Sequence, residues 1–497
     1  CSLVPASVDK RVAERGLIED YFSVRDVGLA SDNQYIDVSQ VNHNAMAKVA
    51  KKSKVCKRTE LKIVNPNAAG IDISTREMQV CVPGDRSEEP NRVFGTFTKD
   101  LHAIASWLKD CQINTVAMES TGIYWLPLFG VLKDAGFEVL LVDPCQAKNY
   151  SGRKTDESDA EWLMLLHSYG LLRSCHQPEN MVRKLRNLTR HRDNLIKSAS
   201  REVLHMQKEM EQMNLKLNNV FSDILGKSGQ AIIESILAGE RDAEKLASLA
   251  DKSCKASHED IVASLQATWD DDHLFIMKQS HELYIYYREM TKKCENEIEI
   301  LMQKFTAEVD DKKLKELRSH KQKAYRGDVS FDIERYAIGM WGVNVMRIPG
   351  INRNAVLRLA SELGGDFVAK FETVDRFLSW ANLVPNNKIS GGKILSSKVP
   401  KRKNPVGIIF RQCANALWKA SNTMGDYFRH SKARSGHLQA MVATGKKLAT
   451  IFFTIIQRQQ EYDEEVCTKN RKAQLERKIE YTKRKLARLE LQVDACI

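Results

Sequence analysis

The chain has 497 residues, of which 43% are hydrophobic, and its formal net charge is +12. Its length predicts two to four domains, and its hydrophobic content is sufficient for packed cores. Eleven cysteines, an odd number with no Cys-x-x-Cys pair, argue against a disulfide framework or a zinc site and indicate reduced thiols in a cytosolic compartment. No run of about 18 apolar residues occurs, so we expect no membrane-spanning segment and no membrane partner.

Positive charge is concentrated in the C-terminal part of the chain. From Val384 onward there are 23 Lys and Arg against 9 Asp and Glu, a net charge of +14, which leaves −2 for the remainder. Such asymmetry favours a polyanionic partner, most often nucleic acid, although a merely soluble basic protein is the alternative.

Residues 1–60 show no clear periodicity and are predicted to be a leader or a disordered extension. The first residue is Cys, and the first methionine, Met46, precedes a basic tract at 48–58. We expect a natural start near Met46 with a translated leader before it. A real but poorly ordered extension is the alternative.

Residues 61–175 are predicted to form an α/β domain. Short apolar runs bounded by turn residues indicate strands, and helical spacing of apolar residues indicates helices. The predicted strands are Ile71–Ser74, Met78–Val82, Val93–Phe97, Thr115–Met118 and Phe137–Val142, and the predicted helices are Leu101–Leu108 and Tyr124–Leu132. Strand hairpins followed by alternating strands and helices predict a ribonuclease-H-like mixed sheet.

Residues 176–340 are predicted to be a helical coiled-coil region with an insert. Apolar residues three and four apart form two stripes. The first holds Ile196, Ala199, Val203, Met206, Met210, Met213, Leu217 and Val220, and the second holds Leu283, Tyr287, Met290, Cys294, Ile298 and Leu301. The stripes predict an antiparallel helical hairpin or a coiled coil, with a helical insert over Ser228–Leu265. We interpret the methionine-rich stripe as an oligomer or arm contact.

Residues 341–457 are predicted to be a third, mostly α-helical domain. Its Ile348-Pro349-Gly350-Ile351 turn before a helix is similar to a helix-hairpin-helix, in which backbone amides such as that of Gly350 face a DNA phosphate. An ordinary turn between helices is the alternative.

Residues 458–497 are predicted to be a basic helix that pairs with another subunit or lies along nucleic acid, or else is solvated. Its heptad stripe holds Leu475, Ile479, Thr482, Leu486, Leu489 and Val493.

Four carboxylates occur at strand ends and at a helix start. Asp72 lies in the run Ala68–Ile73, Glu119 closes Val116–Met118, and Asp156 and Asp159 stand three apart at the start of an apolar-periodic helix. Hard divalent cations prefer oxygen ligands and can clamp the attacking and leaving oxygens of a phosphate. The pattern therefore predicts a metal-dependent phosphodiester site, with neighbouring Lys154 as a candidate nucleic-acid contact. The alternative role of Asp156 and Asp159 is to complement the helix dipole.

A second candidate group surrounds Ser390-Gly391-Gly392-Lys393. A serine beside paired glycines has a reachable hydroxyl, which can attack phosphorus if its deprotonation is assisted. A glycine-rich turn that grips phosphate without a covalent role is the alternative. The candidate phosphate-binding cations are Lys388, Lys393, Lys398, Lys401, Arg402 and Arg411.

Over residues 65–455 the chain resembles the DEDD transposases of the insertion sequence one-ten family, including its branch with a longer middle region. The matching segments are Gly70–Asp72, Met118–Trp125, Lys154–Ala160, Leu217–Val220, Ile236–Asp242, Ile348–Ile351, Phe371, Trp380, Pro385 and Ser390–Lys393. Family members usually have a basic-Gly-Asn step after the serine motif, whereas this chain has Lys403 before Asn404.

The resemblance implies a RuvC-like N-terminal domain that binds Mg²⁺, with Mn²⁺ as the alternative ion, through Asp72, Glu119, Asp156 and Asp159. It implies that Ser390 is the nucleophile and forms a transient phosphoserine link to DNA. It also implies homodimers or homotetramers and a structured non-coding guide RNA that pairs with donor and target DNA. A bacterial cytoplasmic, nucleoid-associated location is expected.

Three functions follow as hypotheses. The first is an RNA-guided recombinase that uses both the carboxylates and Ser390. The second is a RuvC-like structure-selective DNA endonuclease, which needs the carboxylates alone. The third is an inactive nucleic-acid-binding remnant.

Overall fold

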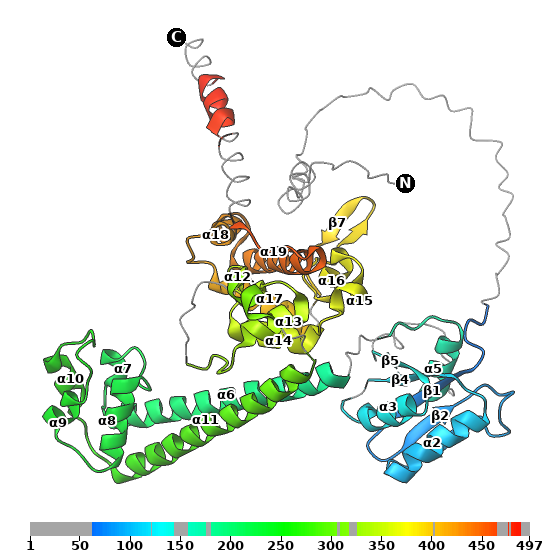
Figure 1. Cartoon of the computed structure of the whole chain (residues 1–497), viewed down its shortest axis with the longest axis horizontal. Coiled ribbons are helices and arrows are strands. Elements are labelled where there is room, and N and C mark those ends of the chain that lie inside the picture. Colours follow the sequence, from blue (N-terminus) through cyan, green and yellow to red (C-terminus); the bar gives the residue numbers. More distant parts are fainter. Residues whose placement is uncertain are drawn as a thin grey trace, which may run out of the picture. The chain divides into compact units, whose positions relative to one another are not determined.

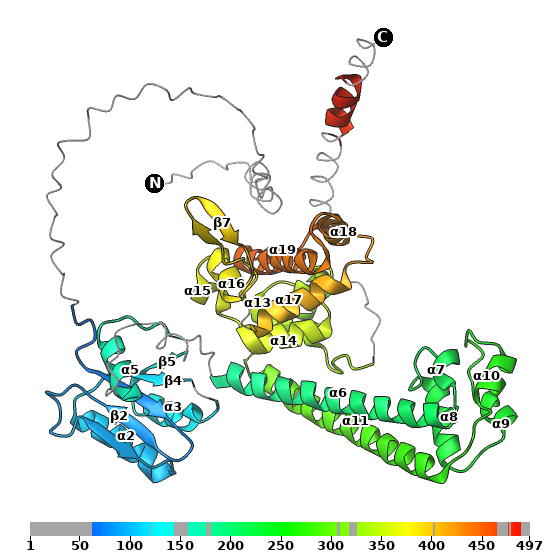
Figure 2. The same cartoon turned by 180° about the vertical axis from the view of Figure 1, so that it is seen from behind.

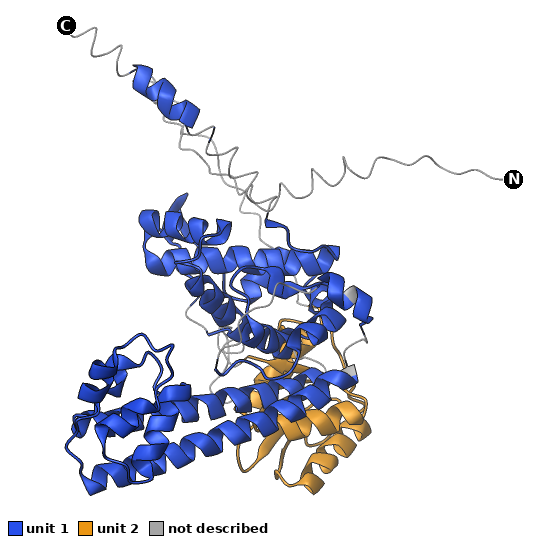
Figure 3. Cartoon of the chain, turned by 60° about the vertical axis from the view of Figure 1, so that its left-hand side comes forward, with its two compact units in different colours: residues 1–28, 178–497 blue, residues 29–177 orange. Residues whose placement is uncertain are grey.

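The computed structural model describes residues 62–120, 122–143, 158–174, 180–305, 309–317, 326–400, 403–464, 476 and 479–488. The chain divides into two compact units, one ending at Gln177 and the other beginning at Pro178 (Figure 3). We refer to them as the N-terminal unit and the C-terminal unit. The predicted leader, residues 1–60, lies outside the described residues.

The N-terminal unit contains a five-stranded mixed sheet with the strand order β3-β2-β1-β4-β5 (Figure 1). Its strands are β1 (Ala68–Ile73), β2 (Met78–Cys81), β3 (Asn91–Phe94), β4 (Thr115–Glu119) and β5 (Glu138–Val142). The β1–β2 and β2–β3 pairs are antiparallel, whereas β1–β4 and β4–β5 are parallel. This confirms the predicted mixed sheet and is consistent with a ribonuclease-H-like fold.

One predicted strand ends earlier than expected because a helix begins there. The Asp100 side chain accepts a hydrogen bond from the Phe97 backbone amide at 3.1 Å, so helix α2 (Thr98–Asp110) starts immediately after Phe97. Phe97 itself is 74% exposed. A first-turn acid therefore converts the end of an apolar run into a helix start.

Helices cover both faces of the sheet. On one face, α2 and α3 (Trp125–Asp134) bury Ile104, Leu128 and their neighbours against the apolar side chains of the strands. On the other face, α5 (Asp159–Ser168) packs Trp162, Leu163 and Leu166 against β4 and β5. The edge of the sheet where β1 and β4 end therefore lies between two helical layers.

The C-terminal unit begins with a long helical hairpin. Helices α6 (Asn180–Gln212) and α11 (Asp271–Phe305) lie side by side in both views (Figures 1 and 2) and are antiparallel: the Cys294 thiol donates to the Leu188 carbonyl near one end, and His273 contacts Glu209 near the other. The far end of the hairpin, the tip, carries a helical insert that begins near Leu217 and not at Ser228 as predicted. The left-handed φ of Asn214 (+56°) follows the end of α6, so the last stripe residues, Leu217 and Val220, lie beyond that helix. The helices of the insert are α7 (Leu217–Val220), α8 (Lys227–Leu237), α9 (Ala243–Ser248) and α10 (His258–Ser264).

The methionine-rich stripe is a contact within the helical arm, so of the two roles we expected for it the oligomer contact is wrong. Met206, Met210 and Met213 are each fully buried, in one hydrophobic cluster with Ile232 and Ile233 of α8. The predicted heptad spacing located an apolar face correctly, but the insert of the same chain covers it. Oligomerisation therefore needs another surface.

The remaining helices form a body with an aromatic core. Phe367, Phe377, Phe410, Phe452 and Phe453 are all fully buried and stack or meet edge to face. The elements of the body are α12 (Asp311–Leu317), α13 (Ile333–Trp341), η2 (Val345–Arg347), α14 (Arg353–Leu363), α15 (Phe367–Phe371), α16 (Val374–Trp380), β6 (Lys388–Ser390), β7 (Lys393–Ser396), α17 (Pro405–Ala416), α18 (Thr423–Ser435) and α19 (His437–Arg458). This confirms a mostly α-helical C-terminal region.

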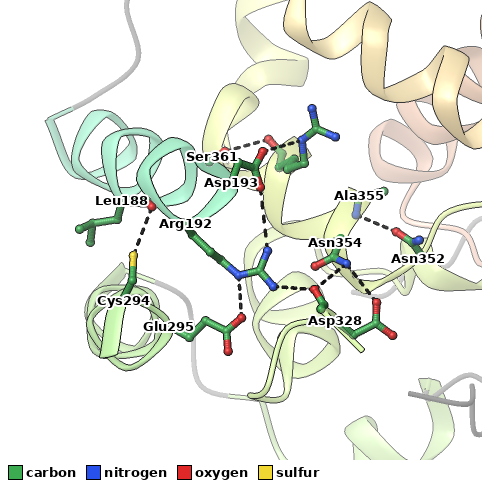
Figure 4. A network of polar contacts seen from close by, with 12 residues as sticks. Leu188, Arg192, Asp193, Cys294, Glu295, Asp328, Asn352, Asn354, Ala355 and Ser361 are labelled. Atoms are coloured by element: carbon green, nitrogen blue, oxygen red, sulfur yellow. Dashed lines mark hydrogen bonds and ion pairs between the residues drawn. The ribbon is translucent and has the colours of Figure 1, made fainter. Parts of the chain in front are cut away.

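A buried polar network joins the helical hairpin to this body (Figure 4). The Arg192 guanidinium on α6 contacts Glu295 on α11 at 2.6 Å and donates to the Gly327 carbonyl at 3.0 Å. Arg192 and Glu295 are 1% and 4% exposed. Glu295 also accepts from the Ser330 amide and hydroxyl, so one ion pair links both long helices to the loop that enters the body.

Part of the predicted basic tail is helical. Residues 479–488 form a helix on which Ile479 and Leu486 are 55% and 56% exposed. Leu475, Leu489 and Val493 of its heptad stripe lie outside the described residues.

Among the helices that the structure describes, none is both long enough and apolar enough to cross a membrane.

The buried ion pair predicts a large effect of removing one partner. In Arg192→Met, Glu295 would remain buried without its counter-charge, and we expect the free energy of unfolding to fall by about 3–5 kcal/mol. Urea unfolding followed by circular dichroism measures this. As a matched control, Arg376→Met, which breaks the exposed pair Arg376–Glu372, should cost less than about 1 kcal/mol. Equal losses in the two variants would contradict a structural role for the network.

Candidate functional site

Two of the four predicted carboxylates lie on adjacent strands. The parallel register pairs Ile71 of β1 with Met118 of β4, so the next residues, Asp72 and Glu119, are neighbours at the carboxyl ends of the two strands. Both side chains are half-buried. Register partners project from the same face of a sheet, so this face presents a pair of acidic groups beside α5.

A glycine brings α5 against this face. A Cβ atom on Gly70 would lie 2.1 Å from the Ala160 carbonyl oxygen and 2.3 Å from the Met164 nitrogen. Only glycine permits this approach of strand and helix backbones. Because Gly70 and Asp72 are two residues apart on β1, they project from the same face, and α5 therefore covers the face that carries the carboxylates.

The start of α5 is fixed by hydrogen bonds. Ser158 caps the helix by accepting from the Glu161 amide at 3.1 Å, and its hydroxyl also accepts from the Asn91 side chain of β3 at 3.0 Å. Asp159, the first residue of the helix, is exposed. The sequence reasoning missed Ser158 and Asn91, although a serine three residues before a glutamate is a recognisable capping signal.

Two further titratable groups lie near this face, Cys81 of β2 and His167 of α5 itself, and burial favours the neutral form of each. Burial, reinforced by the charge of Glu161, raises the pKa of the Cys81 thiol to about 12. Burial also lowers the pKa of His167, whose ring lies 2.9 Å from the Thr115 hydroxyl. Neither side chain therefore adds charge to the face that Asp72 and Glu119 share.

The other members of the predicted carboxylate site cannot be placed in the same way. Asp156 and the neighbouring Lys154 lie outside the described residues. Among the residues that the structure describes, no group of three or more His, Cys, Asp or Glu side chains is arranged to hold a metal ion. The structure therefore brings together Asp72 and Glu119 and positions the helix that begins with Asp159.

Ser390 lies beside the turn of a two-stranded hairpin. Strands β6 and β7 are antiparallel, and Ser390 pairs with Lys393 across the two-residue loop. The loop residues Gly391 and Gly392 have φ angles of +54° and +77°, the left-handed conformation required at both positions of a type I′ turn. Ser390 and the turn are exposed, so the hydroxyl is accessible to a large substrate.

Two family models match the chain on either side of the helical insert. One, of the IS110 DEDD group and described as "Transposase", matches residues 69–215, which include the sheet, α5 and α6. The other, described as "Transposase IS116/IS110/IS902 family", matches residues 343–429, which include the Ser390 hairpin. The chain belongs to the IS110 family of transposases. No curated protein matches it significantly.

Membership of this family makes the chain a DNA transposase, an enzyme of insertion-sequence transposition and DNA recombination. The composition of residues 376–460 suits the binding of a polyanion such as DNA. The segment contains 15 Lys and Arg but a single acid, Asp426, which is paired with Arg429. Such a surface attracts DNA phosphates without sequence preference.

The candidate phosphate-binding residues of this transposase differ in accessibility. Lys388, Lys393 and Lys398 lie on or beside the hairpin and are exposed. Arg411 on α17 is only half-exposed, and its burial lowers the pKa of its guanidinium, so part of its surface is used in packing. Lys401 and Arg402 lie outside the described residues.

The glycine of the predicted helix-hairpin-helix turn has a packing role. Gly350 has a φ of +86°, and a Cβ there would lie 2.8 Å from the Cys413 carbonyl oxygen and 3.0 Å from Leu417 Cγ. The turn is therefore packed closely on α17. Asn352 caps the following helix by accepting from the Ala355 amide at 2.9 Å, as expected of a turn between helices.

Asn404, which follows the unusual Lys403, connects two helices of the body. Its side-chain Oδ1 caps α17 by accepting from the Gly407 amide at 3.2 Å, and its side-chain Nδ2 donates to the Trp380 carbonyl at the end of α16 at 2.9 Å. Pro405 occupies the first helical turn, where a missing amide hydrogen costs nothing.

Gly70 provides a test of the strand–helix contact behind the carboxylates. In Gly70→Ala the new methyl group would overlap α5 backbone atoms, and we expect a loss of about 3 kcal/mol in unfolding free energy, the upper end of the usual overpacking cost. Gly130→Ala in α3, where the Cβ would meet no atom within 4 Å, is the matched control and should be neutral or slightly stabilising. Urea denaturation of both variants measures these changes in unfolding free energy. A neutral Gly70→Ala would refute the close contact.

Proposed function

We propose that this transposase cuts and rejoins DNA with Ser390 as its nucleophile and with a divalent cation held by Asp72, Glu119, Asp156 and Asp159. The observation that carries the proposal is the presentation of the Ser390 hydroxyl at an exposed glycine turn within an almost acid-free, lysine-rich segment. A phosphate diester is anionic, so it concentrates at such a surface, and the neighbouring lysines favour the added charge of the transition state.

The donor chemistry of the carboxylates fits Mg²⁺, with Mn²⁺ as the alternative ion. Asp72 and Glu119 offer carboxylate oxygens at adjacent strand ends, which hard cations prefer over sulfur or nitrogen ligands. When bound, the cation would stabilise charge on the phosphate oxygens and assist deprotonation of the attacking hydroxyl. We assign Asp156 to the same set from its position three residues before Asp159.

The reaction is a pair of balanced transesterifications. Ser390 loses its hydroxyl proton, and its Oγ forms a bond to phosphorus while the bond from phosphorus to one sugar oxygen breaks. That sugar oxygen takes up a proton and leaves as a hydroxyl. In rejoining, a sugar hydroxyl of another strand attacks the phosphoserine and Ser390 recovers its proton. The number of phosphoester bonds is unchanged, so no external energy source is needed.

The proposal includes partners. DNA is the substrate of a transposase, and we propose a structured guide RNA that specifies donor and target by base pairing, which leaves the protein to contact backbone and shape. We also propose a homodimer or homotetramer that acts at the nucleoid of a bacterial cytoplasm. Ser390 and the carboxylates belong to different compact units, so the mechanism requires both units to act on one phosphate.

The nucleophile is tested by trapping the covalent intermediate. Ser390→Ala should retain nucleic-acid binding but lose the denaturant-resistant protein–DNA adduct and strand exchange, a fall of at least about a thousandfold. The assay contains Mg²⁺, element-end DNA and the RNA transcribed from that end. Ser397→Ala, an exposed serine beyond β7, is the matched control and should behave as wild type.

The carboxylates are tested in the same assay. Asp72→Asn and Glu119→Gln remove charge without adding bulk, so both should abolish cleavage while leaving affinity for DNA nearly unchanged. Mg²⁺-dependent cleavage that survives in Ser390→Ala but not in these variants would favour the plain RuvC-like endonuclease. Cleavage that survives in all of them would reject both mechanisms.

The lysines of the hairpin predict a defined salt dependence. Replacing Lys388, Lys393 and Lys398 together by Gln should reduce the slope of log affinity against log salt concentration by about 2.7, since each phosphate contact contributes about 0.9. Fluorescence anisotropy with duplex DNA from low to physiological salt measures the slope. An unchanged slope would remove these lysines from the DNA-binding surface.

A further inference from the structure

The β6–β7 hairpin exposes large apolar side chains beside the candidate nucleophile. Ile389, Ile394 and Leu395 are 62%, 63% and 69% exposed. Soluble proteins seldom leave such side chains together on a two-stranded ribbon, because exposed apolar strands promote aggregation. Exposure of this kind indicates a surface that is covered when the protein acts.

The strand register divides the hairpin into two chemically different faces. Ser390 pairs with Lys393, so their side chains project from one face, and Ile389 pairs with Ile394, so theirs project from the other. At the end of the hairpin, one face thus carries a hydroxyl and an ammonium group, and the opposite face carries two branched hydrocarbons. The register shifts between Lys388 and Ile389, so Leu395 has no partner across the hairpin and is assigned to neither face.

The charge around the hairpin selects the occupant of its apolar face. From Arg376 to Gly425 the chain contains no Asp or Glu at all, and Lys388 and Lys393 are the chain neighbours of Ile389 and Ile394, with Lys398 four residues beyond. A second copy of the hairpin would bring like charges together, whereas DNA offers a polyanionic backbone together with flat apolar base surfaces.

We propose that the β6–β7 hairpin is a DNA wedge, in which Ile389 and Ile394 pack against an unstacked base pair while Ser390 and Lys393 face the adjacent phosphate of the strand to be cut. This inference rests on the proposed attack of Ser390 on DNA and adds a positioning role for the two isoleucines. The wedge separates the scissile strand from its neighbouring bases, so that the phosphate is reached in an open and deformable backbone.

The spacing of the two pairs suits this role. Adjacent residues of a strand are about 3.4 Å apart, which is close to the rise of one base step. The apolar pair therefore lies about one base step behind the reactive pair. Because Gly391 and Gly392 have no side chains, the end of the hairpin beyond Ser390 and Lys393 consists of backbone alone.

The wedge is tested with the fluorescent base analogue 2-aminopurine placed beside the cleaved phosphate, whose position is first mapped with the wild-type adduct. We expect wild-type protein, with Mg²⁺ and guide RNA, to raise the fluorescence through unstacking. The double variant Ile389→Ser with Ile394→Ser should lose this rise and form adduct at least about tenfold more slowly on paired DNA. On DNA with a mismatch at that step, where unstacking costs least, its rate should return to within about threefold of wild type.

Two controls separate this inference from the function on which it rests. Leu438→Ser, at a side chain 71% exposed on α19, removes one exposed apolar side chain away from the hairpin and should change neither readout. Ser390→Ala should keep the fluorescence rise and lose the adduct, so an adduct in that variant defeats the proposed nucleophile without touching the wedge.

The wedge is overturned if the double variant unstacks the step as wild type does, or if the mismatch fails to restore its rate. It is equally overturned if the double substitution instead lowers the oligomeric mass or abolishes guide-RNA binding, since the apolar face would then bind protein or RNA.

Discussion

The buried ion pair between Arg192 and Glu295 is the constraint on which the C-terminal unit depends. Two charges removed from water are tolerable only when they meet each other and satisfy their remaining hydrogen bonds. Here those bonds come from the Gly327 carbonyl and from Ser330, so both long helices and the following loop must be correctly arranged at once. Asp193 of α6 extends the junction to Arg358 of α14 at 3.3 Å. The hairpin is therefore attached to the body by these polar contacts together with the apolar packing of Leu185, Ile298 and Met302 in the core of the body.

Glycines shape both parts of the candidate site. Gly70 lets α5 approach the sheet until its backbone touches β1, and this contact brings a helix start to the face of Asp72 and Glu119. Gly391 and Gly392 adopt the left-handed conformation that closes a tight hairpin beside Ser390. In each case the absence of a Cβ decides the local backbone geometry, which is a close contact at Gly70 and a left-handed turn at Gly391 and Gly392.

Most of the fold could be predicted from the sequence, but less of the candidate site could. Short apolar runs between turn residues predicted the strands of the mixed sheet, since burial and local turn chemistry act over a few residues. The sequence also located the apolar stripe through Met206 and Met210. It could not identify α8 as the element that covers the stripe, because the spacing of apolar residues does not say which surface packs against them. The end of the strand near Phe97 depended on one acid, Asp100, whose capping role became apparent only with the helix start in place.

For a similar reason, the two faces of the Ser390 hairpin could not be predicted from the sequence. The segment Ile389–Ile394 reads as a strand–turn–strand, but its apolar side chains would ordinarily be assigned to a core. Only the register and the exposure of Ile389 and Ile394 show that they face solvent while Ser390 and Lys393 lie opposite. Asp156, in contrast, was reached from spacing and family resemblance, and its role rests on these alone.

The hairpin of α6 and α11 divides the C-terminal unit into two parts that can unfold separately. Its tip has a hydrophobic cluster of its own, built around Met206, Ile232 and Tyr284, which is separate from the aromatic core of the body. Cooperative unfolding follows shared packing, so two cores joined by a pair of helices behave as two foldons. Backbone amides in α8–α10 therefore exchange with solvent through a local opening that leaves the Phe452 core intact. The tip can therefore melt locally while the serine hairpin remains in place.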